Sequence, residues 1–478
     1  MSFDRRAQSL FLVFSILAAA CTAPTSDGES EKQSEAAESV SAANAPKGPA
    51  IHDSFDKGGV LRTIDVNGPI DESGPFFQSF GTNGRRCSTC HVENDAWTIT
   101  PRHVQDRFDD TDGTDPLFRP VDGASAPNLP VATKDERRKA YNMLLTKAVI
   151  RIGLPIPAGA QFELAAVDDP YKFASAAELS LFRRPLPTTN LKFLATVMWD
   201  GRETIAGQAI TSDLAHQAND ATLGHARAMT PLPDAVRQQI VDFEMGLFTA
   251  QIFDRVAGDL RDLGAQGGPQ SLVAQPFFLG INDPLGHNPT GAAFDPNVFT
   301  IYEAWAKVPK AKPHCREEED EARRSIARGE DLFNNLPIAI TGVGGLNDDL
   351  HEPTLPGHCT TCHDTPNSGN HSVSAPLNLG LTDASRRTPD LPLYTLRNLT
   401  THETIQTTDP GRALVTGQWK DIGRFKGPIL RGLAGRAPYF HNGFAADLDA
   451  VIDFYDQRFD LHLTTEQHDD LVRFLRVL

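Results

Sequence analysis

The sequence predicts a mainly α-helical protein of two domains, the first enlarged by loops and extra helices. The prediction rests on a Cys-x-x-Cys-His pattern that occurs as CSTCH at residues 87–91 and again as CTTCH at residues 359–363. A stretch rich in Lys, Pro and acidic residues at 307–324 lies between them and is typical of a linker followed by a new helix. With 478 residues the chain has room for two or three cores.

Helical signals accompany both copies of the pattern. Residues 322–333 (ARRSIARGEDLF) carry apolar residues at helical spacing, and a long helix is expected from about Asp234. Near the C-terminus, Thr464 and Gln467 form a capping-box pattern that predicts a helix start. The apolar stripe of that last helix is Leu471, Phe474, Leu475 and Leu478.

The composition is that of a globular protein, with 40% hydrophobic and 22% charged residues. A formal net charge of −17 argues against a nucleic-acid partner, because phosphate binding needs Lys and Arg.

The N-terminus predicts export through a signal peptide at residues 1–20, with two arginines, a short apolar core and small residues before Cys21. Cys21 is either a lipidated first residue of the mature chain or simply the residue after the cut, since Leu17 stands one position too early for a typical lipobox. Residues 21–50 predict a disordered tether. We therefore expect a periplasmic protein, free or lipid-anchored.

A Cys-x-x-Cys-His sequence suits covalent attachment of haem. Thioether bonds join the two cysteines to the porphyrin, and the adjacent histidine ligates the iron. A zinc site made of four thiolates explains neither the two histidines nor the long separation between the pairs. Of six cysteines, Cys315 and Cys21 lie outside the pattern, and Cys315 is interpreted as a free thiol. The two predicted haem c sites use Cys87, Cys90 and His91, and Cys359, Cys362 and His363.

Three further stretches resemble the bacterial di-haem cytochrome c peroxidase/MauG family. They are MWDGRETIAGQA (198–209), FKGPILRGLAGRAPYFHNG (425–443) and DLDAVIDFYDQRF (447–459). The resemblance covers most of the chain beyond residue 75. It implies two cytochrome c-like domains, here placed at residues 51–310 and 318–478. It also implies that the N-terminal haem reacts with hydrogen peroxide and that the C-terminal haem takes in or stores electrons.

The resemblance assigns roles to single residues as well. His91 and His363 match the proximal iron ligands, and Trp199 matches a tryptophan that relays oxidising equivalents between the haems. Without the family, Trp199 is equally a large aromatic residue that orders an interface. The family also binds calcium, partly through backbone carbonyls that here belong to Arg436 and Pro438.

Peroxide cleavage needs a group that moves a proton between the two oxygens. The family uses a glutamate for this, with a glutamine earlier in the chain, and Gln208 fits the glutamine. The glutamate has no clear counterpart, because Ala218 or Asn219 stands at the nearest position. The substitutes are Asp220, His216 and His225, each of which is otherwise a helix-surface or capping residue.

The ligand opposite His363 cannot be a methionine of the second domain, because no methionine follows Met245. The remaining candidates are His371, His402, His441, His462, His468 and Tyr455. Tyr455 shares a helical face with residues 448, 451 and 452, so it points inward. The resemblance places Met at this position in the peroxidase branch and Tyr in the MauG branch. We expect Tyr455 to ligate the second iron, where a phenolate favours oxidised states; the alternative is simple packing beside the haem.

Two functional classes stay open. The first is an exported di-haem oxidoreductase that uses hydrogen peroxide and exchanges electrons with a small redox protein (cytochrome c or cupredoxin) or oxidises a protein substrate. The second is a di-haem electron-transfer protein without peroxide turnover, which the missing glutamate favours.

Overall fold

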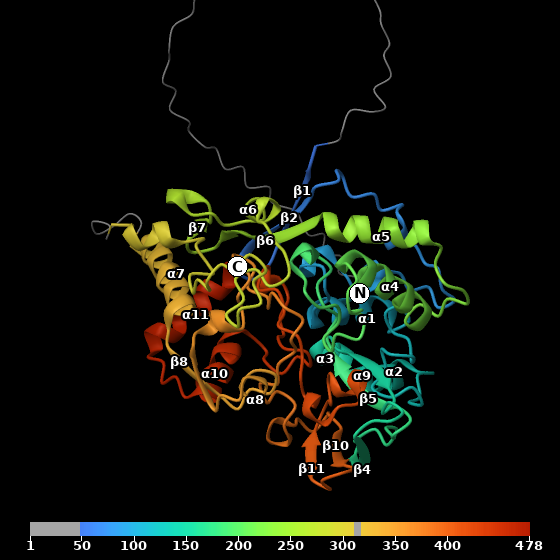
Figure 1. The fold of residues 1–478 in the computed structure, drawn as a ribbon. Coiled ribbons are helices and arrows are strands. Elements are labelled where there is room, and N and C mark those ends of the chain that lie inside the picture. The colour runs from blue at the N-terminus through green and yellow to red at the C-terminus, as the bar shows by residue number, and fades with distance from the viewer. Residues whose placement is uncertain (1–47, 310–316) are drawn as a thin grey trace, which may run out of the picture. The chain divides into compact units, whose positions relative to one another are not determined.

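The fold mixes helices and strands, with 33% of the chain helical and 17% in strands (Figure 1). The prediction of a mainly α-helical protein is therefore wrong. Stretches for which no helix was predicted pair as strands, and such pairing leaves no helical periodicity in the sequence. The computed structural model describes residues 48–309 and 317–478, which belong to one compact unit.

The described α-helices are α1 (Pro101–Thr111), α2 (Lys134–Ala140), α3 (Asn142–Lys147), α4 (Ile210–Gly224), α5 (Asp234–Gly246), α6 (Gln270–Ala274), α7 (Glu317–Asn335), α8 (Asn347–Leu350), α9 (Ala413–Thr416), α10 (Leu448–Phe459) and α11 (Thr465–Arg476). The described strands are β1 (Ala50–Phe55), β2 (Gly59–Asp65), β3 (Ile150–Leu154), β4 (Phe162–Asp168), β5 (Leu179–Arg183), β6 (Leu247–Asp254), β7 (Gly258–Asp259), β8 (Ile338–Thr341), β9 (Thr354–Gly357), β10 (Leu393–Asn398) and β11 (Thr404–Thr407).

The largest sheet has the antiparallel order β1–β2–β6–β7. A tight turn joins β1 to β2, and Asp56 Oδ1 closes it by accepting hydrogen bonds from the backbone nitrogens of Gly58 (2.6 Å) and Gly59 (2.7 Å). The adjacent glycines and the β-branched residues of β2 (Val60, Thr63 and Ile64) were strand signals available in the sequence. The predicted helix at Asp234 is confirmed as α5, and the chain passes from it directly into β6 (Figure 1).

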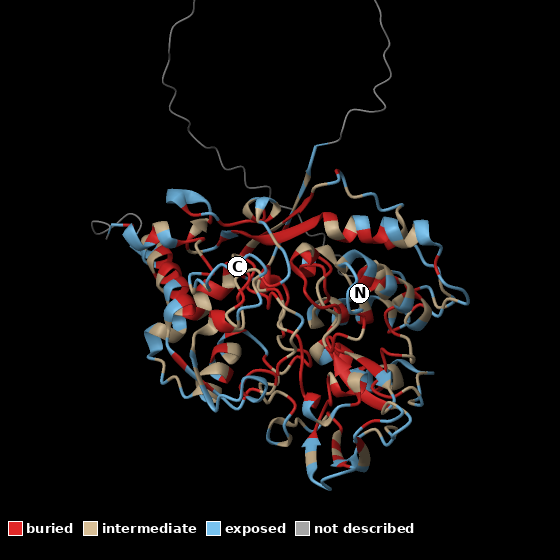
Figure 2. Ribbon diagram, in the orientation of Figure 1, coloured by how far each residue is buried: buried red, intermediate tan, exposed pale blue. Residues whose placement is uncertain are grey.

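A second sheet, in the order β11–β10–β4, joins distant parts of the chain. Strand β4 belongs to the predicted domain 51–310, whereas β10 and β11 belong to the predicted domain 318–478. The two predicted domains therefore share a sheet, and the boundary between them stays a prediction. Strands β3 and β5 form a separate pair, and every residue of β5 is buried (Figure 2).

Helices α7 and α11 cross closely. A Cβ atom at Gly329 of α7 would lie 2.0 Å from the backbone oxygen of Asp470 in α11, so only glycine allows this approach. Ser325 and Arg328 bind the Asp470 carboxylate from the same helix, with Ser325 Oγ at 2.5 Å and Arg328 Nε at 2.7 Å. The capping box of Thr464 and Gln467 is present, which confirms the predicted start of α11.

Part of the sequence prediction lies outside the described residues. This part comprises the signal peptide (1–20), nearly all of the tether (21–50), Cys21 and Cys315; at the end of the predicted tether, Ala50 already begins β1. Within the described ranges, no helix has both the length and the hydropathy needed to cross a bilayer.

Candidate active site

Each pentapeptide lines its own cavity. Cavity 1 contains Cys87, Cys90 and His91, and cavity 2 contains Cys359, Cys362 and His363. The two motifs adopt the same short 3-10 turn, over Cys87–Thr89 and Cys359–Thr361. In each turn the backbone nitrogen of the histidine donates a hydrogen bond to the backbone carbonyl of the first cysteine, at 3.1 Å for His91 and 3.2 Å for His363.

Both histidines are oriented as metal ligands. The Nδ1 atom of His91 lies 3.1 Å from the Trp97 carbonyl, and that of His363 lies 2.6 Å from the Gly369 carbonyl. A proton donated from Nδ1 leaves Nε2 as the free lone pair. Burial lowers the pKa of each ring to about 4, so both are neutral near pH 7.

Eight residues line both cavities and so form the wall between them. They are Arg184, Pro185, Leu186, Pro187, Trp199, Lys426, Pro428 and Arg436. Trp199 is fixed at both ends, because its Nε1 donates to the Arg184 carbonyl (2.8 Å) and its own carbonyl accepts from the Lys426 nitrogen (2.9 Å). Trp199 therefore lies between the two pentapeptide cavities, while its role as a relay stays a prediction.

Three cations of the wall have no carboxylate partner among the described residues. Arg184, Lys426 and Arg436 donate only to backbone carbonyls, those of Ile99 (2.9 Å), Thr196 (3.0 Å) and Ile429 among them. Burial lowers the pKa of Lys426 to about 7 and that of each arginine to about 10. Buried cations call for an anion. A haem carries two propionate carboxylates, so paired thiols, one free imidazole nitrogen and these cations together fit haem c.

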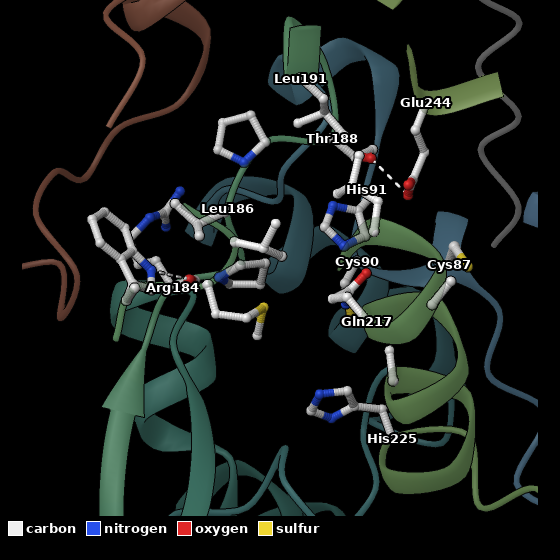
Figure 3. A pocket seen from close by; sticks show the side chains of 18 of the residues that line it. Cys87, Cys90, His91, Arg184, Leu186, Thr188, Leu191, Gln217, His225 and Glu244 are labelled. Atoms are coloured by element: carbon white, nitrogen blue, oxygen red, sulfur yellow. Dashed lines mark hydrogen bonds between the residues drawn. The ribbon is translucent and has the colours of Figure 1, made fainter. Parts of the chain in front are cut away.

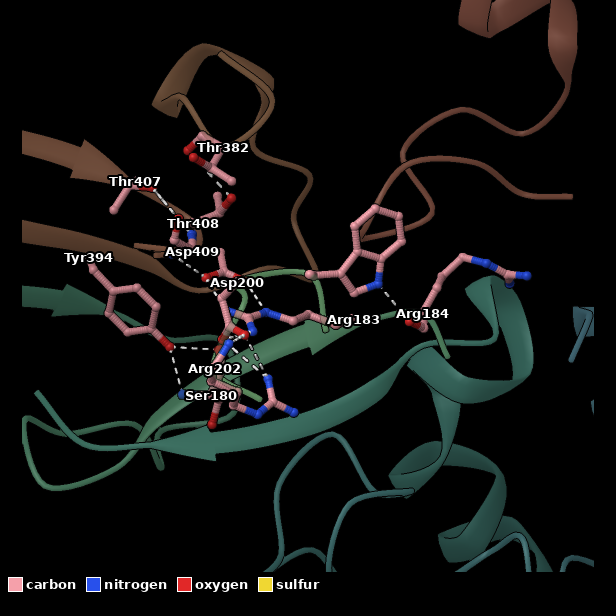
Figure 4. A network of polar contacts seen from close by, with 12 residues as sticks. Ser180, Arg183, Arg184, Asp200, Arg202, Thr382, Tyr394, Thr407, Thr408 and Asp409 are labelled. Carbon is pink, nitrogen blue, oxygen red and sulfur yellow. Dashed lines mark hydrogen bonds and ion pairs between the residues drawn. The ribbon is translucent and has the colours of Figure 1, made fainter. Parts of the chain in front are cut away.

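A buried ion network holds the wall in place (Figure 4). Arg183 in β5 binds Asp409 through two hydrogen bonds (2.7 and 2.9 Å) and Asp200 through a third (2.5 Å). Burial by itself raises the pKa of Asp200, but the charges of Arg183 and Arg202 hold this pKa at about 2. Arg183 precedes Arg184 and Asp200 follows Trp199, so the network anchors both partners of the Trp199 contact.

Cavity 1 also contains a histidine held by a carboxylate. His225, which caps the C-terminus of α4, places Nδ1 at 2.5 Å from Asp122 Oδ2, and Arg85 binds the other oxygen of Asp122. Burial by itself raises the pKa of Asp122, but Arg85 and His225 hold this pKa below its usual range. The Nε2 atom of His225 has no hydrogen-bond partner among the described residues. Figure 3 shows Gln217 and His225 beside His91 in this cavity.

Parts of the chain match named cytochrome c peroxidases. The match to cytochrome c peroxidase IdrP1 of Pseudomonas sp. (strain SCT) is 30% identical over 140 residues, 25% of this chain and 36% of that protein. The match to IdrP2 of Denitromonas iodatirespirans is 32% identical over 104 residues, 21% of this chain and 28% of that protein. The chain thus matches only about a third of the length of these relatives.

These partial matches support the resemblance of the chain to the di-haem cytochrome c peroxidase/MauG family. No family model matches the chain. A MauG-like protein associated with microbial copper homeostasis, whose crystal structure is known, aligns over 89% of this chain and 93% of its own, with 15% identity and a TM-score of 0.38.

Neither of the two residues nearest to the position of the family's glutamate, Ala218 and Asn219, is acidic. Ala218 is buried in the wall of cavity 1, on the same helix as Gln217. The predicted Gln208 lies exposed ahead of α4, and His216 and Asp220 lie on the exposed side of that helix. His216 instead pairs with Glu203, at 2.6 Å. Of the four predicted pocket residues, the structure brings His225 alone to the cavity.

Sequence reasoning missed a second acid in cavity 1. Glu244 is buried, and its Oε1 accepts a hydrogen bond from Thr188 Oγ1 (2.8 Å), while Oε2 has no partner among the described residues (Figure 3). Burial raises the pKa of Glu244 to about 7. Glu244 lies four residues after the buried Ile240 in α5, so both residues are on the same face of the helix. An acid on an apolar helix face is unusual, and this pattern was the signal for a functional residue that the sequence offered.

Two of the predicted ligand candidates for the second iron line cavity 2, namely Tyr455 and His441. The Tyr455 hydroxyl has no hydrogen-bond partner among the described residues. By contrast, Tyr141, Tyr302, Tyr394 and Tyr439 each donate to a backbone carbonyl. The His441 ring is stacked on Phe425, with centroids 4.1 Å apart. His371, His402, His462 and His468 do not line the cavity. Ligation by Tyr455 stays a prediction that this geometry favours.

The hydrogen bonds around Arg436 do not support the predicted calcium ion at the backbone carbonyls of Arg436 and Pro438. The Arg436 carbonyl accepts a hydrogen bond from Arg184 Nη2 (3.0 Å). Two buried guanidinium groups beside the position would repel a cation.

Proposed function

We propose that this protein is an exported di-haem c-type oxidoreductase of the peroxidase type, which reduces hydrogen peroxide in cavity 1 with electrons that arrive through cavity 2. The observation that carries the proposal is the pair of Cys-Cys-His cavities on either side of one wall that contains Trp199. The partial matches to cytochrome c peroxidases support the same reaction class.

Two haem c groups would supply the redox chemistry when bound. Cys87 and Cys90 would attach the first group, and Cys359 and Cys362 the second. His91 and His363 would ligate the irons, and the buried cations of the wall would pair with the propionates. A calcium ion is not needed for any step.

His225 is proposed to move the proton in cavity 1. Its Nδ1 proton is held by Asp122, so the free Nε2 takes a proton from one peroxide oxygen and returns it to the other as the O–O bond breaks. Two electrons and two protons then convert one peroxide to two waters. Asp122 acts as a positioning residue, because its ionised carboxylate fixes the tautomer and orientation of the ring.

The electrons are proposed to come from a small periplasmic redox protein and to cross the wall beside Trp199. An indole between two redox centres can share an oxidising equivalent, and its contacts to Arg184 and Lys426 hold it there. Tyr455 would hold the second iron together with His363. A phenolate there favours an oxidised second site, which suits storage of oxidising equivalents.

Electron transfer without peroxide turnover is the second candidate. It is favoured by the lack of an acid at Ala218 or Asn219, the positions nearest to the family's catalytic glutamate. The two candidates differ in whether peroxide reacts at all.

The test is rapid mixing of the purified holoprotein with hydrogen peroxide, once fully oxidised and once with a single haem prereduced. A peroxidase shows a fast change in the haem absorption of cavity 1 and consumes peroxide. No spectral change in either redox state supports the electron carrier.

A further inference from the structure

A buried cluster of three possible metal ligands lies beside the pentapeptide of cavity 2 and takes no part in the steps above. Asp283, Asp364 and His371 each place one ligand atom within 4.8 Å of the other two. Asp283 is 2% exposed, Asp364 0% and His371 7%. Carboxylates buried together are unfavourable unless a cation or a proton lies between them.

Asp283 supplies an oxygen that no protein donor satisfies. Its Oδ2 accepts hydrogen bonds from the backbone nitrogens of Leu285 (3.1 Å) and His287 (2.8 Å) and lies 2.9 Å from His287 Nδ1. Its Oδ1 is buried and has no partner among the described residues. A buried carboxylate oxygen without a donor is costly, so a ligand at this position would stabilise the fold.

The other two residues are spaced like neighbouring ligands of one ion. Asp364 Oδ2 lies 3.2 Å from His371 Nδ1 and 3.1 Å from Ser372 Oγ, and Asp364 Oδ1 accepts from the Ser372 nitrogen (2.7 Å). Metal bonds of about 2.0–2.2 Å place adjacent ligand atoms roughly 3 Å apart.

We propose that Asp283, Asp364 and His371 bind one divalent transition-metal ion, Zn²⁺ or Mn²⁺, that is separate from the haem irons. One imidazole with two carboxylates suits these ions, whereas Ca²⁺ takes six to eight oxygen ligands. The ion fastens the segment around Asp283, which lies in no helix or strand, to the turn of residues 364–372. That turn includes Gly369, whose carbonyl accepts a hydrogen bond from His363 Nδ1, so the metal would hold the segment that orients His363.

A second cluster serves as a matched control. Glu203, His216 and Asp220 are also close enough to share an ion, but His216 and Asp220 are exposed to solvent. No buried carboxylate oxygen without a partner is found there among the described residues. We therefore expect no tightly held metal at this control cluster.

The experiment measures metal content per chain in the purified holoprotein by mass spectrometry of the elements. We expect Zn or Mn near one equivalent beyond the haem iron. Asp283→Asn and His371→Asn should each lower it by about tenfold or more, and His216→Ala should leave it unchanged. After chelation, Zn²⁺ or Mn²⁺ should raise the Tm of the wild type but not that of the variants.

Wild-type protein that holds no metal beyond its haem iron, and whose Tm does not respond to Zn²⁺ or Mn²⁺, would overturn the proposal in favour of a buried water at Asp283. A response to Ca²⁺ alone would overturn the choice of ion. Because the wild type alone decides both outcomes, a variant that fails to fold does not obscure the result. Neither readout depends on peroxide turnover.

Discussion

His225 carries most of the proposed peroxide chemistry among the single residues of cavity 1. The His225→Ala variant should reduce peroxide about 10²- to 10³-fold more slowly, because it loses the group that moves the proton. His216→Ala, on the exposed side of α4, should keep the wild-type rate. Steady-state oxidation of a reduced c-type cytochrome measures both. A His225→Ala protein with unchanged haem absorption and an unchanged rate would contradict this role.

Tyr455 differs from its neighbour Tyr439 in one respect that a spectrum can detect. Both line cavity 2, but the Tyr439 hydroxyl already donates to the Leu433 carbonyl (2.8 Å). Tyr455→Phe should change the ferric absorption and electron paramagnetic resonance signal of one haem and leave the other unchanged. Tyr439→Phe should change neither. Identical spectra for wild type and Tyr455→Phe would remove Tyr455 as a ligand.

Residue roles were predictable where the chemistry is local in sequence. A Cys-x-x-Cys-His run identifies Cys87, Cys90 and His91 by itself, since five consecutive residues carry the whole signal. The hydrogen bond between His225 and Asp122 joins residues 103 positions apart, and no sequence pattern around either residue predicts this contact. Such contacts follow from the fold, which the sequence pattern did not specify.

Helices and strands differed in how well the sequence predicted them. The end of the chain was predictable because a capping box and a helical stripe agree on α11. Strand β4 was not predictable, because its partner β10 lies more than two hundred residues away in the sequence. The exposed residues of β4 also include both apolar and charged side chains, so they show no strand pattern. The prediction of a mainly α-helical fold was wrong because strand pairs between distant segments, such as β4 and β10, leave no clear signal in the sequence.

The crossing of α7 and α11 depends on Gly329. Gly329→Ala should lower the free energy of unfolding by about 1–3 kcal/mol, because its Cβ would lie 2.0 Å from the Asp470 carbonyl and force the helices apart. Gly224→Ala, where nothing lies within 4 Å of the added carbon, should be neutral or slightly stabilising. Urea unfolding of the two holoproteins compares them. Equal stability of Gly329→Ala and wild type would show that the helices can separate at little cost.

The ion network of Arg183 links the stability of the whole molecule to pH. Asp200 has a pKa lowered from 3.8 to about 2, so its contribution is complete above about pH 4 and is lost as pH falls toward 2. Asp200→Asn should cost about 3 kcal/mol at pH 7, because Arg183 loses one buried partner. The difference from wild type should shrink at pH 3.

Urea unfolding at pH 7 and pH 3 measures this dependence. Asp168→Asn is the control, because its ion pair with Arg387 is exposed and should matter little at either pH. A cost of Asp200→Asn that stays constant between the two pH values would show that the carboxylate charge is not what the network requires.

In the whole molecule, the proposed peroxide turnover requires two cavities that act together across one wall. The shared sheet of β4 and β10 and the buried Arg183 network hold the two parts of the chain in a fixed relation. The sequence indicated two haem sites and a tryptophan between them, because the family motifs are short and local. The unpaired cations of the wall emerged only from the structure.

The proposed reaction is peroxide turnover at cavity 1 with electrons that enter through cavity 2. The most direct measurement is peroxide-dependent oxidation of a reduced small c-type cytochrome by the holoprotein. We expect sustained turnover in which two cytochromes are oxidised for each peroxide consumed. A holoprotein with both haems attached that oxidises the cytochrome no faster with peroxide than without it would rule out this function.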